Sequence, residues 1–273
     1  MPDRTPAEIA PAAVEQGVAK ASRRWDSVVV GSFLAGAYIA FGALVAISVS
    51  SGMDPGLWGT LPTLFLGGAF TLGLVLVVIG GADLLTGNMM LLPLAVLRRR
   101  LRSAAVLKNL AIVLVGNLAG AVFVAYFFAV QAGVVGDAGS PAGSLELLAY
   151  ERLVGITESK GGSAGAWEVF LRAVACNWLV CLAIWLSLAS DRITGKILGI
   201  FFPIMAFVAM GFDHVVANMF FLPAAMFAGV PGLTWSDVTV NLSIATVGNL
   251  VGGVVFVALA YWYLYLKDEP ADA

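Results

Sequence analysis

Long apolar stretches are the feature that most restricts how this 273-residue chain can fold. A helix needs about 20 consecutive apolar residues to cross the hydrocarbon core of a bilayer. With 60% hydrophobic and 12% charged residues, the chain is far from soluble domains, in which about 25% of residues are charged. The sequence therefore predicts an all-α integral membrane protein that spans the bilayer with six segments: residues 28–50, 61–97, 107–132, 167–189, 197–228 and 241–266.

The second and fifth segments are too long for one straight crossing. Both carry polar residues, and both have a proline near the far end. We therefore expect each of them to be a broken helix.

The charge and the scarcity of metal-binding side chains exclude several function classes. A formal net charge of −2 provides no basic surface for nucleic acid. One histidine and two cysteines cannot build a usual zinc or haem site, so we expect no metal and no cofactor. Cys176 and Cys181 lie in an apolar run and are interpreted as packing residues.

The distribution of basic residues predicts the orientation, because short cytoplasmic loops collect Lys and Arg. Loops 51–60 and 229–240 contain none, and the longest external loop, 133–166, carries Arg152 and Lys160. Both termini are then cytoplasmic, in a multi-pass protein of the inner (plasma) membrane. The basic residues assigned to the cytoplasmic side are Arg4, Lys20, Arg23, Arg24, Arg98, Arg99, Arg100, Arg102, Lys108, Arg192, Lys196 and Lys267.

Outside the membrane segments, the chain divides into a short N-terminal and a shorter C-terminal part. Residues 1–27 are predicted to contain an amphipathic helix on the cytoplasmic interface, with a disordered tail as the alternative. Residues 28–266 are predicted to form one transmembrane domain of six segments, and 267–273 a cytoplasmic tail. The apolar stripe of the N-terminal helix is Ile9, Ala13, Gly17, Ala21 and Trp25.

An internal repeat relates the first three segments to the last three. GADLLTGNMMLLP from Gly81 matches GFDHVVANMFFLP from Gly211 at an offset of 130, and VGNLAG from Val115 matches VGNLVG from Val247 at an offset of 132. The copies cover about residues 28–132 and 167–266. Because three is odd, the second copy crosses the membrane in the opposite sense. Inverted repeats with broken helices place the binding or permeation site near the midplane, where the breaks meet.

The polar residues at the breaks favour a structural role over a direct role in transport. Asp83 and Asp213 can cap the exposed N–H groups of the half-helices, as can the side-chain oxygens of Thr86, Asn88 and Asn218. Four further small residues predict close helix approach: Gly116, Gly120, Gly248 and Gly252.

His214 is the single histidine and falls in the second break, at the expected depth of the membrane centre. Ionisable groups at that depth are costly and usually mark a pathway. Imidazole exchanges a proton near physiological pH, so His214 could donate a proton to a small anion or hold it by charge.

These stretches, together with CNWLVCLAIW at Cys176–Trp185, resemble the formate/nitrite transporter family along nearly the whole chain. The resemblance implies an aquaporin-like protomer of six helices, two of them broken. It also implies a pentamer in which each protomer has its own pore.

The resemblance further implies the residues of the pathway. Around the central His214 it places Thr86, Asn177 and Asn218, with Lys160 in a vestibule. Asp213 stands where the family usually has glutamate. The implied outer constriction consists of Phe70, Val180 and Phe207, and the inner one of Leu74, Leu84 and Leu85.

These residue types suit small monovalent anions of weak acids, formate first and nitrite next, with hydrosulfide, acetate and lactate also open. Apolar rings pass a neutral acid far more easily than its anion, and a cation at the mouth concentrates anions. The alternative is a neutral-solute, aquaporin-like pore. Against it, the breaks read TGN and VAN instead of Asn-Pro-Ala, and no arginine lies beside them. A membrane enzyme lacks a catalytic constellation.

Overall fold

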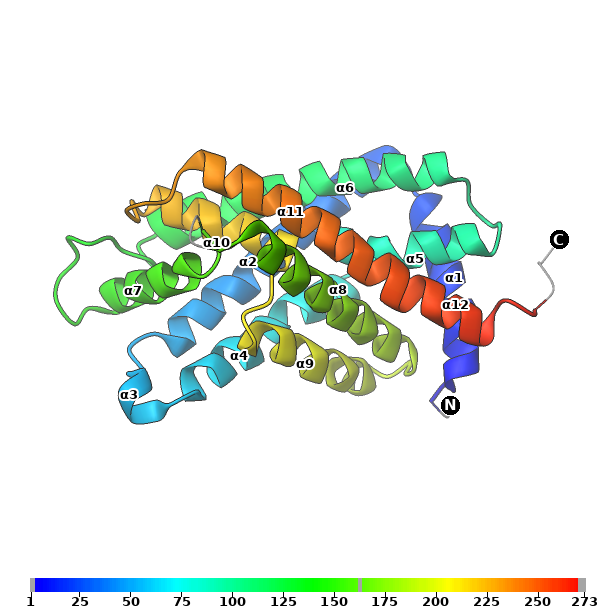
Figure 1. Ribbon diagram of the computed structural model, residues 1–273, viewed down its shortest axis with the longest axis horizontal. Helices are drawn as coiled ribbons and strands as arrows, with labels where there is room; N and C mark the ends of the chain where they lie inside the picture. Colours follow the sequence, from blue (N-terminus) through cyan, green and yellow to red (C-terminus); the bar gives the residue numbers. More distant parts are fainter. Residues whose placement is uncertain (1–2, 162–163, 270–273) are drawn as a thin grey trace.

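The computed structural model describes residues 3–161 and 164–269, and within these residues all regular structure is helical. Figure 1 labels most of the helices. In chain order they are α1 (Pro6–Ala21), α2 (Trp25–Ser50), α3 (Pro55–Trp58), α4 (Leu61–Gly80), α5 (Leu85–Leu97), α6 (Ser103–Phe123), η1 (Val124–Gln131), α7 (Leu145–Glu158), α8 (Ala166–Leu188), α9 (Ile193–Ala209), α10 (Val215–Phe227), α11 (Trp235–Gly253), η2 (Val254–Leu259) and α12 (Ala260–Tyr265).

Five continuous helical segments in the described chain are long and apolar enough to cross a membrane, and shorter apolar helices complete the bundle. The predicted second segment consists of α4 and α5, and the predicted fifth consists of α9 and α10. Gly81 and Gly211 adopt φ of +77° and +70° at the breaks. This left-handed backbone favours glycine because it has no Cβ. The prediction of an all-helical fold with two broken segments is confirmed.

Each half of the molecule repeats the same packing. Helix α2 packs against α4 and α6, as α8 packs against α9 and α11, and contacts between α4 and α9 join the halves. A Cβ added at Gly120 would collide with the carbonyl of Phe33, and one at Gly252 with the carbonyl of Val174. These glycines therefore allow the close helix approach that their spacing predicts.

The third segment of each half contains a stretch of π-helix, which ends the segment in the first half and is followed by α12 in the second. These stretches, η1 and η2, begin at Val124 and Val254, an offset of 130 residues that matches the internal repeat. The repeat therefore extends to a backbone irregularity that hydropathy does not reveal.

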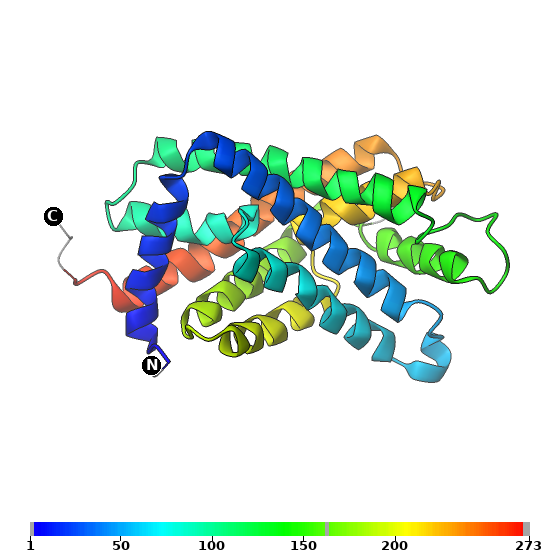
Figure 2. The same cartoon turned by 180° about the vertical axis from the view of Figure 1, so that it is seen from behind.

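The elements divide between two ends of the molecule (Figures 1 and 2). Helices α3 and α7 and the α10–α11 loop lie at one end. Helices α1 and α12 and the α5–α6 and α8–α9 loops lie at the other. The basic loops and both terminal helices thus share one end, an arrangement that agrees with the charge distribution.

The N-terminal segment differs from the prediction in one respect. Helix α1 ends at Ala21, so Trp25 does not continue its apolar stripe but begins α2, where it is 67% exposed. Ile9, Ala13 and Gly17 are buried, and α1 packs against α5. Most of the predicted apolar stripe of α1 therefore packs against the protein. Of the predicted tail 267–273, residues 270–273 lie outside the described chain.

Candidate functional site

The two breaks meet at one hydrogen bond between side chains. His214 Nε2 lies 2.9 Å from Thr86 Oγ1, and both residues are buried. His214 Nδ1 accepts a hydrogen bond from the Ala217 N–H at 3.1 Å, so the ring caps the start of α10. Because Nδ1 acts as an acceptor, the proton of the neutral ring lies on Nε2 and is donated to Thr86. The structure thus brings together the two residues that the sequence analysis placed opposite each other.

The first backbone N–H groups of the two half-helices lack a partner within their helix, and each donates a hydrogen bond to an asparagine of the third or the sixth segment. The Leu85 N–H donates to Asn117 Oδ1 at 2.9 Å, and the Val215 N–H donates to Asn249 Oδ1 at 2.8 Å. Asn117 Nδ2 also donates to the Asp83 carbonyl, as Asn249 Nδ2 does to the Asp213 carbonyl. One amide per half therefore satisfies several backbone groups at a break.

The prediction that Asp83 and Asp213 cap the half-helices is wrong, because both carboxylates are occupied by cations. Asp83 pairs with Lys20 and Arg23, each at 2.7 Å. Asp213 pairs with Lys160 and Arg172, each at 2.9 Å. The missed caps had a signal in the sequence, since the matched VGN motifs carry Asn117 and Asn249 at the same position.

Lys160 does not act as a free charge at the mouth, contrary to the sequence-based expectation. Its side chain is only 7% exposed and donates to Asp213 and to the Phe212 carbonyl. A buried carboxylate needs such partners, since desolvation of an unpaired charge costs several kcal/mol. Arg172 is the second partner, and it also pairs with Glu168 at 2.9 Å. The sequence analysis missed this arginine.

Asn88 and Asn218 occupy matching positions and each leaves one acceptor unused. Asn88 Nδ2 donates to Asn109 Oδ1 at 2.8 Å, and Asn218 Nδ2 donates to Asn241 Oδ1 at 2.9 Å. Asn218 Nδ2 also donates to Asp213, a carboxylate that fixes which way this amide faces. Both Oδ1 atoms are buried and have no hydrogen-bond partner in the described chain.

Asn177 lies close to the His214–Thr86 pair, but its side chain donates hydrogen bonds to backbone carbonyls. Its Nδ2 donates to the Asn249 carbonyl at 2.7 Å and to the Thr86 carbonyl at 3.3 Å. It therefore links α8 to both repeats and does not hydrogen-bond His214.

Aromatic rings cover the histidine on one side. Phe70 and Phe207 meet edge to face with centroids 5.9 Å apart, and the Phe207 ring lies 5.7 Å from the His214 ring. Phe221, which the sequence analysis did not select, stacks on Phe70 at 6.5 Å. Phe70 and Phe207 are 1% and 2% exposed, so the rings close this side.

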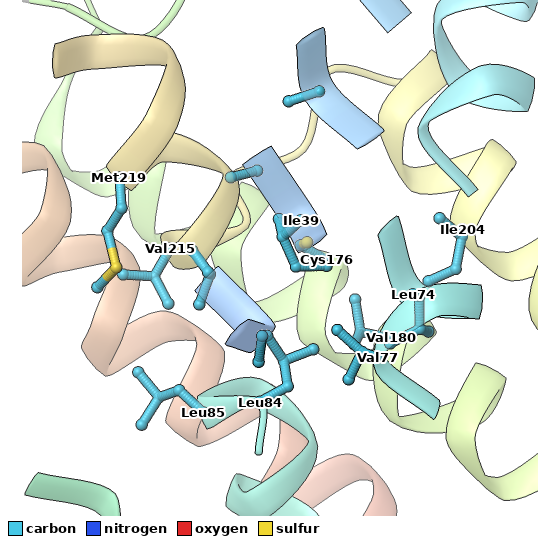
Figure 3. Close-up of a cluster of buried hydrophobic side chains, with 14 of the residues drawn as sticks. Ile39, Leu74, Val77, Leu84, Leu85, Cys176, Val180, Ile204, Val215 and Met219 are labelled. Carbon is cyan, nitrogen blue, oxygen red and sulfur yellow. The ribbon is translucent and has the colours of Figure 1, made fainter. Parts of the chain in front are cut away.

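Aliphatic side chains form a second apolar group. Figure 3 shows Leu74, Val77, Val180 and Leu84 pointing into the same space, although the sequence analysis assigned Val180 to the outer constriction. Leu85 points away from this group (Figure 3). Leu84 is the extended residue before α5 and Leu85 is the first residue of that helix, and successive side chains of extended backbone point to opposite sides.

A cavity lies on each side of this centre. The outer one, of about 140 Å³, is lined by Phe70, Phe207, Lys160 and Asn218 among others. The inner one, of about 230 Å³, is lined by Lys20, Arg23, Leu84 and Asn88 among others. Each has room for a small hydrated solute. His214 is not among the residues that line either cavity.

Metal chemistry finds no support in the described residues. No group of three or more His, Cys, Asp or Glu side chains there could hold a metal ion. Cys176 and Cys181 are buried and unpaired, as expected of packing residues.

Comparison with known proteins gives a consistent result. A family profile described as "Formate/nitrite transporter" matches residues 7–263. A probable formate transporter of Methanothermobacter thermautotrophicus is 48% identical, over 97% of this chain and 98% of the relative. The formate channel BtFdhC of Bacillus thuringiensis is 40% identical, over 97% of this chain and 96% of the relative. The solved structure of a pentameric formate channel with formate bound superposes with a TM-score of 0.74 at 27% identity, covering 89% of this chain and 98% of that one.

Proposed function

This chain belongs to the formate/nitrite transporter family, whose members are membrane transporters and channels and not enzymes. We propose that it passes small monovalent anions across the plasma membrane, with formate as the main solute and nitrite as the second. The observation that carries the proposal is the His214–Thr86 hydrogen bond where the two breaks meet. It provides one polar centre between two apolar constrictions.

The apolar constrictions select the form in which the solute crosses. Moving an unpaired carboxylate into an apolar environment is prohibitive, whereas the neutral acid carries no net charge. Phe70 and Phe207 on one side and Leu74 and Leu84 on the other therefore favour the protonated acid. Leu85, which points away from this path, is not part of the proposed inner constriction.

His214 and Thr86 act at the centre of the path. The Nε2–H and the Thr86 hydroxyl can turn from each other to the oxygens of a small acid or anion. A proton on His214 Nδ1 would displace the Ala217 N–H. The neutral ring is thus the favoured resting form, and His214 stabilises the solute by donating a hydrogen bond from Nε2–H, while its own proton stays on the ring.

The unused Asn88 and Asn218 oxygens suit a neutral acid on either side. An amide oxygen accepts a hydrogen bond from the O–H of an acid but repels an anion. Asn88 lines the inner cavity and Asn218 the outer one. Each is placed to receive the acid beside a constriction.

The assembly and orientation follow from the family and the charge distribution. We infer a pentamer in which each protomer has its own pore, by likeness to the pentameric formate channel. The end that carries α1 and α12 faces the cytoplasm, because the basic loops lie there. We further propose that residues 28–266 form the channel domain, preceded by an N-terminal segment, 1–27, that contains α1, and followed by the tail 267–273.

Flux through purified protein in liposomes tests the function. We expect formate uptake that rises as the external pH falls, nitrite uptake at a lower or similar rate, and no acceleration of glycerol-driven swelling. Glycerol or water flux without formate uptake would refute the anion pathway in favour of an aquaporin-like pore.

A further inference from the structure

The wall of the outer cavity includes a second cationic side chain, that of Arg152. Arg152 lies on α7 and forms part of the cavity wall, together with Lys160, Phe70 and Phe207. Its Nε donates to Ser50 Oγ at 3.1 Å, at the end of α2. The sequence analysis recorded this arginine only as one of two basic residues in the external loop.

The other cations of this region are neutralised. Lys160 and Arg172 share Asp213, and Arg172 also pairs with Glu168, so these four side chains balance in charge. Arg152, by contrast, forms no salt bridge with a carboxylate in the part of the chain that the structure describes. The carboxylates of its own helix, Glu146, Glu151 and Glu158, do not line the cavity.

The guanidinium of Arg152 is half-buried, and burial lowers its pKa below the usual range. Arginine stays charged even so, because its ordinary pKa lies above about 12. A half-buried cation without a carboxylate partner gains most from an anion, because the surrounding protein screens their attraction less than water does.

From this arrangement we propose that Arg152 is the anion-capture residue of the outer cavity, a subsite for a small carboxylate or similar oxyanion that precedes the Phe70–Phe207 constriction. The proposal rests on the proposed function and moves the recruiting charge from Lys160 to Arg152. With Nε held by Ser50, the two terminal nitrogens remain to bind both oxygens of a carboxylate. Asn218 lines the same cavity and leaves its buried Oδ1 without a partner, so its amide suits the acid once the anion has taken a proton from the external solution.

The test is the concentration dependence of formate uptake into proteoliposomes. In Arg152→Gln, the formate concentration for half-maximal uptake is expected to rise about tenfold, the lower range of electrostatic focusing, with an unchanged maximal rate. Uptake by the wild type at low formate should fall with added salt, and that of Arg152→Gln should not. Arg152→Lys should remain near the wild type. Lys108→Gln, which removes an exposed charge outside the cavity, is the matched control.

A cysteine variant tests the charge itself. Both native cysteines are buried, so a thiol in Arg152→Cys is the one that a membrane-impermeant reagent reaches. A positively charged methanethiosulfonate adduct should restore the low formate concentration for half-maximal uptake, and a negatively charged adduct of similar size should not. Size-exclusion profiles establish that each variant assembles. If Arg152→Gln does not assemble, the comparison is made with the cysteine and lysine variants.

Two results would overturn the proposal: equal half-saturation in the wild type and Arg152→Gln, or equal effects of the two adducts. Absence of formate uptake by the wild type would instead refute the proposed function. The subsite is then tested by saturation-transfer NMR with formate as the probe on detergent-solubilised protein. Loss of the signal in Arg152→Gln supports the subsite, and a retained signal or none in the wild type overturns it.

Discussion

At the scale of residues, the sequence predicts the identity of the central side chains better than their partners. His214 and Thr86 stand out because one lies in a repeat at membrane depth and the other matches a family position. The hydrogen-bond and ion-pair partners of a side chain depend on the tertiary structure, which the spacing of residues along the sequence does not reveal. The ion pairing of Lys160 with Asp213 joins residues 53 positions apart and reverses the interpretation of the lysine from a free charge to a neutralising one.

A double-mutant cycle tests that pairing. Asp213→Asn alone leaves Lys160 without its full partner and is expected to cost about 3–5 kcal/mol of stability, as when a buried ion pair is broken. Combining it with Lys160→Met removes both charges and should cost less than the sum of the single changes. Thermal unfolding of purified protein, followed by tryptophan fluorescence, measures each variant. Strict additivity would mean that Lys160 and Asp213 do not interact.

At the scale of elements, hydropathy and the internal repeat predict the six segments and both breaks, but not how the breaks are held. An asparagine in an apolar helix has no distinctive pattern, and its role depends on a half-helix start 32 or 34 residues away. The π-helical stretches escape prediction because they leave hydropathy unchanged. Helix α7 was not predicted because charged residues interrupt its apolar sequence and the surrounding segment was interpreted as a loop.

The amides that hold the breaks can be tested by isosteric substitution. Asn249→Leu leaves the Val215 N–H and the carbonyls of Ala173 and Asp213 without their partner. Each buried unsatisfied group costs roughly 1–3 kcal/mol, so we expect a large drop in the unfolding temperature. Asn117→Leu should behave alike in the other half.

Thr246→Val on the same helix is the control for Asn249→Leu. The Thr246 hydroxyl donates to the Leu242 carbonyl within its own helix, a bond that holds no break. We expect a change of less than about 0.5 kcal/mol, as for substitutions away from buried networks. Equal losses in Asn249→Leu and Thr246→Val would contradict the role assigned to the asparagines.

At the scale of the whole molecule, the proposed pathway lies within one chain. Both cavities, both constrictions and the central pair are built from α1, α4, α5 and α7–α10 of the same protomer. The sequence analysis could predict this one-pore arrangement only through the inverted repeat and the family resemblance, because charge and composition do not report where a pore lies.

Mixed assemblies test whether each protomer conducts alone. When wild-type subunits are co-expressed with an inactive His214 variant, formate flux should fall in proportion to the wild-type fraction. Native mass spectrometry counts the subunits and gives their ratio, with five copies expected. A steeper, all-or-none loss would mean that the subunits share one pathway.

Formate uptake by His214→Asn in proteoliposomes tests most directly that the solute passes the His214–Thr86 centre. Asparagine is a good N-terminal helix cap, so α10 should keep its start and the protein its assembly. Without the imidazole Nε2–H at the centre, uptake should fall by about 100-fold, the lower range for the loss of one positioned hydrogen-bond donor. Uptake at the wild-type rate, with the same dependence on pH, would contradict a pathway through this histidine.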